Sequence, residues 1–142
     1  MIELKFSDLE LRAFFITSLN IDFVEVYDEE KGEFILPDWG EFMYDYEILT
    51  TDDKVEDIRI EFTLVHECPD KSSGFNLKIN TTSFFNLKLL DKKSKDQAIF
   101  YTCFPVILGN IRGSMLSVLA QFPAVNRDIP LFDLKDMVKK AL

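Results

Sequence analysis

The stretch from Phe75 to Leu89 constrains the fold more than any other part of the sequence. One parity of residues along it is mostly apolar and the other is mostly polar. Successive side chains of a strand point to opposite faces, so this alternation predicts a strand with one dry and one wet face. At ~3.3 Å per residue the strand would run roughly 50 Å, which is long for a strand. Thr81 and Ser83 interrupt the apolar parity and indicate a bend or bulge. Such a strand needs long neighbours and a cover for its dry face.

Three earlier stretches alternate in the same way and predict strands over about 9–26, 41–50 and 57–66. Short polar connections join the last three of the four predicted strands, which indicates an antiparallel meander. The first strand is apolar on both faces near its middle. A strand covered on both sides, or paired with another subunit, would have that composition.

The connection after the first predicted strand is unusually apolar. A polar turn at 28–32 is followed by Phe34, Ile35, Leu36 and Trp39. A loop with so many large apolar side chains must lie on something. It either packs over its own sheet or lines a groove, and the sequence leaves both open.

The pattern changes to helical after Leu90. A helix is predicted to begin after Ser94, to restart or kink at Phe104-Pro105, and to run over 105–121. Small residues along it permit close approach of another helix, for example between subunits: Gly109, Gly113, Ser114 and Ser117. An extended, proline-bounded segment then leads to a short helix from 131 or 132 to 142.

The predicted fold class is therefore α+β, in one domain spanning 1–142. It consists of a four-stranded antiparallel sheet of long strands, in a Greek-key or meander order, with two C-terminal helices packed on one face.

Composition limits the partners. The net charge is −9, which opposes binding to nucleic-acid phosphates. Two cysteines are too few for a disulfide scaffold, and the N-terminus lacks the pattern of a signal peptide. We saw no apolar run near the ~20 residues of a membrane span. We therefore expect a cytoplasmic protein with no nucleic-acid partner and no membrane insertion.

The sequence contains 14 phenylalanines, so either the core is rich in aromatic rings or some rings face a partner.

The residues that could carry chemistry are sparse. His66 and Cys68 form half a metal site at best, and Cys103 as a nucleophile would need His66 as its base. No glycine-rich phosphate or dinucleotide motif is present. We therefore expect no catalysis, no metal and no cofactor.

Several short stretches, taken in order, resemble the SecB family of export chaperones over roughly residues 9–141. They are Ile21-Asp22-Phe23, Pro37-Asp38-Trp39, the strand from Leu77 to Leu87, Phe104-Pro105, Phe122-Pro123 and Pro130-Leu131-Phe132-Asp133. The resemblance implies a holdase that works without ATP and keeps non-native polypeptides unfolded in hydrophobic grooves. The client-binding residues that it implies are Phe34, Ile35, Leu36, Trp39, Phe122, Val125, Ile129 and Leu131.

The resemblance also implies a homotetramer built as a dimer of dimers. Edges of the first strand would pair across one interface and the long helices would pack across the other. We place Phe14 and Ile16 of the strand, and Ile111 and Met115 of the helix, at these interfaces.

One departure from the family concerns its export partner, the motor SecA. Where export members present acidic residues, this sequence has Asn20, Val24 and Lys78. A SecB-like chaperone dedicated to one client, such as an antitoxin, is therefore an alternative to a role in export. A domain that binds a small apolar ligand between sheet and helices is another.

Overall fold

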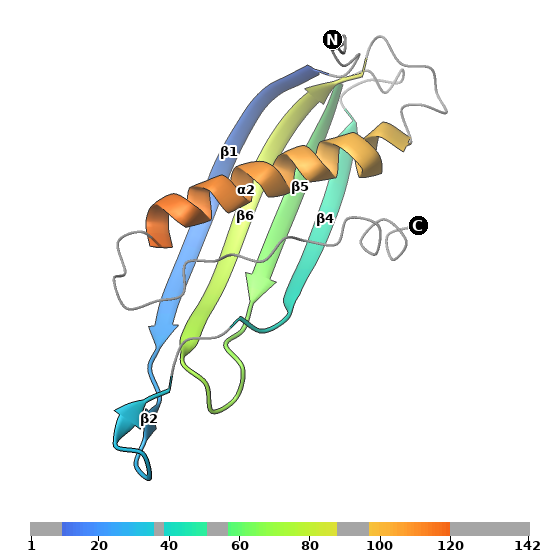
Figure 1. Ribbon diagram of the computed structural model, residues 1–142. Coiled ribbons are helices and arrows are strands. Elements are labelled where there is room, and N and C mark those ends of the chain that lie inside the picture. Colours follow the sequence, from blue (N-terminus) through green and yellow to red (C-terminus); the bar gives the residue numbers. More distant parts are fainter. Residues whose placement is uncertain (1–9, 36–38, 51–56, 88–96, 120–142) are drawn as a thin grey trace, which may run out of the picture.

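The computed structural model describes residues 10–35, 39–50, 57–87 and 97–119 (Figure 1). Its strands are β1 (Glu10–Val24), β2 (Tyr27–Asp28), β3 (Glu33–Phe34), β4 (Phe42–Thr50), β5 (Asp57–His66) and β6 (Gly74–Asn86). Its helical part is a π-helical turn, η1 (Ile99–Cys103), followed directly by α2 (Phe104–Leu119).

The four long strands form one antiparallel sheet in the order β1-β6-β5-β4. The predicted meander is therefore confirmed for β4, β5 and β6, and β1 is added at the β6 edge. The strand predicted over 75–89 ends earlier, at Asn86. β2 and β3 form a separate small hairpin inside the connection that joins β1 to β4. The carboxylate of Asp28 accepts hydrogen bonds from the Glu30 and Lys31 amides in its turn, and Gly32 there has a φ of 67°.

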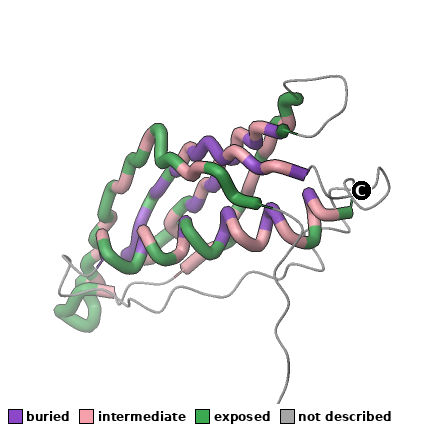
Figure 2. Tube along the Cα trace, turned by 90° about the horizontal axis from the view of Figure 1, so that it is seen from above, coloured by how far each residue is buried: buried purple, intermediate pink, exposed green. Residues whose placement is uncertain are grey.

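One face of the sheet is covered by α2, which crosses the strands obliquely (Figure 1). The buried residues lie between the helix and the sheet, and the far side of the helix is exposed (Figure 2). Alternate residues of β5 and β6 supply the floor of this core, including Phe62 and Phe85. The buried side of α2 consists of Phe104, Ile107, Leu108, Ile111, Met115 and Leu119. We call the face of the sheet under α2 the helix-side face and the other the outer face.

Two irregularities in β1 change the predicted orientation of its side chains. The pairing of β1 with β6 shifts between Leu11 and Ala13 and again between Ile16 and Ser18. Each shift inserts one extra residue and reverses the alternation. The hydroxyl of the second extra residue, Thr17, donates to the Asn80 carbonyl at 3.1 Å. The bulges that we placed near Thr81 thus lie on the opposing strand.

The consequence is a correction to the sequence reading of the first strand. Strict alternation along the first strand puts Phe14 and Ile16 on the opposite face from Leu19, Ile21 and Phe23, but in the structure all five lie on the same side. They pair with the β6 residues that face α2. Most apolar side chains of β1 therefore point to the helix-side face.

The restart predicted at Phe104-Pro105 takes the form of the π-helical turn η1. The amide of Phe104 donates to the carbonyl of Ile99, five residues back. Pro105 has no amide hydrogen, and its ring would clash with the carbonyl four residues before it in a regular helix. The wider turn relieves this clash, so the helical path continues without a break.

The continuous helical stretch Ile99–Leu119 is, by length and composition, apolar enough to cross a membrane. This corrects the view that no apolar run reaches that length. A core helix of a soluble protein passes the same test, and one side of this helix packs on the sheet. The second predicted helix, from 131 or 132 to 142, lies outside the described residues.

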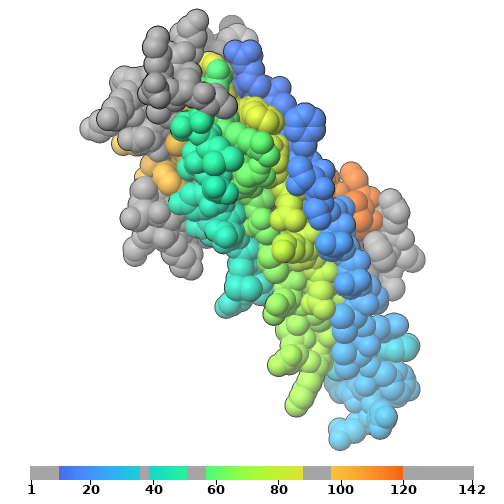
Figure 3. Space-filling view, turned by 180° about the vertical axis from the view of Figure 1, so that it is seen from behind, coloured from blue at the N-terminus to red at the C-terminus, as the bar shows by residue number. Residues whose placement is uncertain are grey.

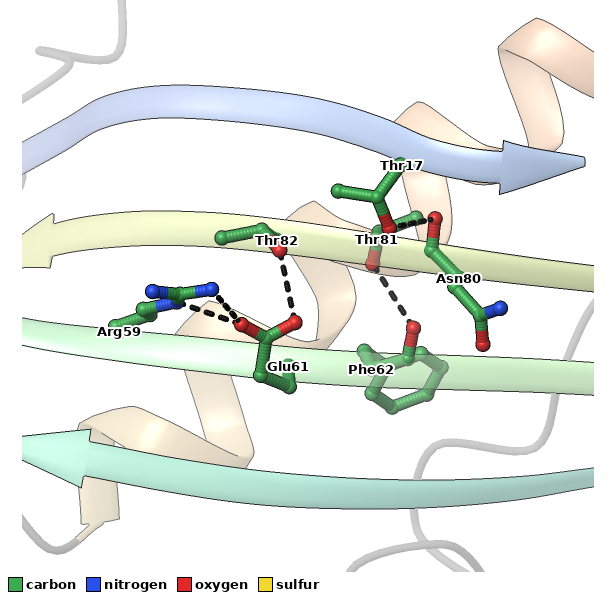
Figure 4. A network of polar contacts seen from close by, with 7 residues as sticks. All are labelled: Thr17, Arg59, Glu61, Phe62, Asn80, Thr81 and Thr82. Carbon is green, nitrogen blue, oxygen red and sulfur yellow. Dashed lines mark hydrogen bonds and ion pairs between the residues drawn. The ribbon is translucent and has the colours of Figure 1, made fainter.

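On the outer face, the four strands of the sheet are not covered by any helix of the described residues (Figure 3). Polar side chains connect the strands there (Figure 4). Glu61 is ion-paired with Arg59 and accepts a hydrogen bond from the Thr82 hydroxyl at 2.8 Å. Thr63 donates to the side-chain oxygen of Asn80 at 2.8 Å. This face is therefore the polar side of the sheet, where side-chain hydrogen bonds and an ion pair connect neighbouring strands.

Candidate functional site

Five rings gather on the helix-side face, at the end of the sheet nearest the β2–β3 hairpin. They come from all four long strands and from the end of the β1–β4 connection, and we call them the aromatic platform: Phe23, Trp39, Phe42, His66 and Phe75. Trp39 is stacked on Phe75, with centroids 5.9 Å apart, and meets the His66 ring edge-on at 5.1 Å. Phe23 lies 5.2 Å from Phe75 and Phe42 lies 4.6 Å from His66. The platform therefore links both edge strands of the sheet.

Trp39 reaches the platform because its neighbour Gly40 is fixed to the sheet. The Gly40 amide donates to Nε2 of His66 at 2.6 Å, and Nδ1 of the same ring lies 2.7 Å from the Phe75 carbonyl oxygen. Since Nε2 accepts, the ring proton sits on Nδ1 and is donated to Phe75. A Cβ on Gly40 would lie 2.9 Å from the Glu67 carbonyl oxygen, so only glycine permits this close approach.

Burial decides the charge state of the two groups that could have carried chemistry. Burial lowers the pKa of His66 below its ordinary value, although its bond to the Phe75 carbonyl acts in the opposite direction. Burial raises the pKa of the Cys103 thiol to about 12. His66 is therefore neutral with both nitrogens bonded to the backbone, and Cys103 is a protonated core residue. Within the described ranges, no group of three or more His, Cys, Asp or Glu residues gathers to hold a metal.

A second apolar surface runs along β1 on the helix-side face, and we call it the β1 stripe. It includes four large side chains that keep more than a third of their surface exposed: Leu11 (38%), Ile16 (38%), Leu19 (38%) and Phe23 (36%). Phe14 and Ile21 lie on the same side and are partly buried against the core. Phe23 belongs to both the stripe and the platform, so the two surfaces are continuous.

The hairpin adds two exposed rings beyond the end of the sheet. Tyr27 and Phe34 are 50% and 55% exposed and contact each other edge-to-face at 5.1 Å. The hairpin is joined to the sheet through Val26. The Val26 amide donates a hydrogen bond to the buried Ser73 hydroxyl at 2.9 Å. Phe34 and Ile35 line a shallow depression with Asp28, Lys31 and Glu33.

The residues predicted for the client groove are only partly brought together. Phe34 and Ile35 lie at the hairpin, and Trp39 lies on the platform. The remaining predicted residues lie outside the described part of the chain: Leu36, Phe122, Val125, Ile129 and Leu131. Of the two readings of the connection, packing over its own sheet holds for Trp39.

The residues predicted for subunit interfaces divide into two groups. Phe14 and Ile16 lie on the β1 stripe at the sheet edge. Ile111 and Met115 are 0% and 1% exposed and pack against the sheet, so their side chains are turned away from any second subunit. This corrects the placement of these two residues, because a contact through α2 would have to use its exposed side.

The three positions considered for SecA lie at the β1–β6 pairing. Asn20 is the direct partner of Lys78, and Val24 is the partner of Gly74. Asn20 and Lys78 line a shallow depression of the outer face together with Asp22, Glu67 and Asn76.

Sequence reasoning missed most of the platform. Phe23, Phe42 and Phe75 were read as ordinary strand residues, and His66 was considered only as a ligand or base. The available signal was that each of the three phenylalanines lies at the end of a predicted strand, close to the apolar connection.

The comparisons with known proteins concern the fold. No family profile matches the sequence, and no curated protein is similar to it in sequence. The structure is similar to that of Rv1957, a SecB-like chaperone of Mycobacterium tuberculosis solved in complex with a ChAD peptide from the Rv1956 HigA1 antitoxin. The TM-score is 0.50 at 11% identity, and the match covers 88% of this chain and 92% of that chain. The comparison therefore supports the SecB-like fold that we expected from the sequence.

Proposed function

We propose that this protein is a chaperone that binds non-native polypeptides without using ATP. One observation carries the proposal: the aromatic platform and the β1 stripe form a continuous apolar surface on a SecB-like fold, and this surface is partly exposed along β1 and buried at His66 and Phe75. Soluble monomers seldom expose contiguous apolar patches of large size, and those that occur mark interaction sites. The similar chaperone Rv1957 was solved with a peptide bound, which supports a polypeptide as the partner.

The physics of the surface suits many different clients. Burial of apolar area is worth about 25 cal/mol per Å² and has no directional requirement. Aromatic rings bury large areas with few rotatable bonds, so they lose little entropy on binding. In addition, β1 is an edge strand whose outer backbone groups have no partner strand in the described sheet. An extended client could pair with such an edge through main-chain hydrogen bonds, independently of its sequence.

We further propose that the protein assembles as a homotetramer, a dimer of dimers. Two features support this. The β1 edge carries exposed apolar residues on both faces, with Phe15 54% exposed on the outer face. The exposed side of α2 contains Gly109 and Gly113, where an added Cβ would contact nothing within 4 Å. Glycines at that spacing allow two helices to approach closely.

Two client classes remain in the proposal. One is precursor proteins for export, and the other is a single dedicated client such as an antitoxin. The second is favoured by the antitoxin peptide bound to Rv1957, and by Asn20 and Lys78 at positions where acidic residues would suit SecA. We propose no catalytic activity and no cofactor, and a cytoplasmic site of action.

The test combines activity with assembly. Purified protein should suppress the aggregation of a chemically denatured test protein at a stoichiometric ratio, without nucleotide. It should also bind reduced carboxymethylated α-lactalbumin, which stays unfolded, and native mass spectrometry should give a mass of four chains. A monomer that neither binds this probe nor suppresses aggregation contradicts the proposal. A tightly held lipid-like molecule in the same spectra would point instead to a small apolar ligand.

A further inference from the structure

His66 is a buried ionisable side chain of the helix-side face, and its hydrogen bonds hold a neighbouring segment of the described chain in place. Its side chain belongs to β5, but its two hydrogen bonds join β6 to the end of the β1–β4 connection, through Phe75 and Gly40. The ring is 1% exposed and contacts Trp39 and Phe42. The bond from Gly40 therefore ties the residue next to Trp39 to the sheet, beside the ring contacts that Trp39 itself makes with Phe42, His66 and Phe75.

That bond exists only in one protonation state. Nε2 must carry a lone pair to accept the Gly40 amide, and a protonated ring is a donor at both nitrogens. Adding a proton would set two donors against each other, 2.6 Å apart, while leaving the bond to the Phe75 carbonyl intact. Acid should thus remove one specific contact, the one that holds Trp39-Gly40 to the sheet.

Among the described residues around His66, the hydrogen bonds of the ring go to backbone groups and to no side-chain carboxylate. On the helix-side face, the neighbours of His66 on β4 and β6 are Phe42, Tyr44, Phe75 and Leu77. The flanking segments and the outer face contribute these titratable groups: Glu41, Glu67, Cys68, Asp22 and Lys78. The two hydrogen bonds of the ring itself are to the Gly40 amide and the Phe75 carbonyl, and only the bond from Gly40 is incompatible with a proton on Nε2.

We propose that His66 is a positioning residue of the client-binding surface and acts as a pH-sensitive latch for Trp39. Neutral His66 holds Trp39 stacked on Phe75, and protonated His66 releases Trp39-Gly40 from the platform. Client binding then weakens in mild acid while the sheet and α2 stay folded. The link to clients rests on the proposed function, whereas the latch itself does not.

Trp39 is the sole tryptophan of the chain, so its fluorescence reports on this contact directly. In the wild-type protein, the emission maximum should shift to the red as the pH falls below 6.5, with unchanged far-UV circular dichroism. His66→Gln, whose amide oxygen can accept from Gly40 but does not titrate, should lose the shift. Glu67→Gln is the matched control and should keep it.

Nuclear magnetic resonance gives a second readout that needs no variant. The His66 ring nitrogens and the Gly40 amide should titrate with the same midpoint, and the amide should lose protection from exchange below it. The latch is overturned if the ring titrates while Gly40 stays protected, or if the red shift survives in His66→Gln. It is also overturned if the shift coincides with loss of the β-sheet signal, because the event is then global unfolding.

The effect on client binding is measured with fluorescein-labelled, reduced carboxymethylated α-lactalbumin. The affinity of this probe for the wild type should fall about tenfold across the same pH transition, and its affinity for His66→Gln should change little. If the probe binds at no pH, the proposed function fails while the fluorescence still decides the latch. If the probe binds equally across the transition, His66 does not position the client-binding surface.

Discussion

Trp39 is stacked on Phe75, with ring centroids 5.9 Å apart and ring planes 28° apart. The two residues are far apart in the sequence and belong to different parts of the fold. Phe75 is buried at the start of β6, and Trp39 is only partly buried at the end of the β1–β4 connection. The stack therefore fixes a connection of the chain to the floor of the sheet, and it presents an aromatic ring beside the β1 stripe.

Replacing this ring should weaken client binding. Trp39→Ala removes one of the partly exposed rings of the platform, and we expect the affinity for reduced carboxymethylated α-lactalbumin to fall about tenfold, or about 1.4 kcal/mol. Fluorescence anisotropy of the labelled probe measures it. Met43→Ala is the matched control, because Met43 is 56% exposed but lies on the outer face. Equal losses for both variants would mean that binding is not confined to the helix-side face.

Gly40 should resist substitution by alanine. The new methyl group would lie 2.9 Å from the Glu67 carbonyl oxygen and would push Trp39-Gly40 off the sheet. We expect a loss of about 1–3 kcal/mol in the free energy of unfolding, measured by urea titration. Met43→Ala, at an exposed side chain of the outer face, should instead change the free energy of unfolding by less than about 0.5 kcal/mol. A neutral Gly40→Ala would show that the contact yields easily.

The exposed side of α2 should decide assembly. Gly113→Leu adds a bulky side chain where the single chain has open space, so folding of one subunit should be unaffected. If two helices meet there, the variant should lose the tetramer and sediment as a smaller species in analytical ultracentrifugation. A tetramer that tolerates this change would place the helix-mediated interface elsewhere.

The stability of the protein should depend on His66 in a defined pH window. Burial lowers the folded-state pKa of His66, so the unfolded chain takes up the proton at a higher pH. Its contribution to stability is therefore complete above the ordinary pKa of 6.5 and is lost as the pH falls from there through the lowered value. The slope is at most about 1.4 kcal/mol per pH unit. Urea titrations at several pH values should show this component in the wild type and not in His66→Gln. Subtracting the free energy of unfolding of His66→Gln from that of the wild type at each pH removes the contribution of the carboxylates, which both proteins share.

The two thiols should differ sharply in reactivity. Cys103 is 0% exposed with its pKa raised to about 12, so it should react with a disulfide reagent such as DTNB only after unfolding. Cys68 is partly exposed and should react in the folded protein, although its Sγ lies 3.1 Å from the Ser72 carbonyl oxygen. Cys68→Ser should abolish the reaction of the native protein. Rapid labelling of Cys103 in that variant would show that η1 opens from the sheet.

The sequence determined the four long strands and the helix, because each shows its period directly. The alternation from Phe75 onward and the apolar side of 105–121 depend only on neighbouring residues along the chain. Short polar connections likewise determined the β4-β5-β6 meander. The excess of phenylalanine left open an aromatic core or rings that face a partner, and the apolar connection, through the resemblance to SecB, gave Phe34 and Trp39 as candidates.

The tertiary structure decided which faces these residues occupy. The extra residues Arg12 and Thr17 in β1 turn Phe14 and Ile16 onto the same face as Leu19, and nothing local in the sequence marks a bulge. Likewise, Ile111 and Met115 are interior because α2 lies on the sheet with that side, a choice made by packing between distant segments. The contact between His66 and Gly40 spans 26 residues of chain. Such a contact is set by where the connection returns to the sheet, which no periodicity along the chain encodes.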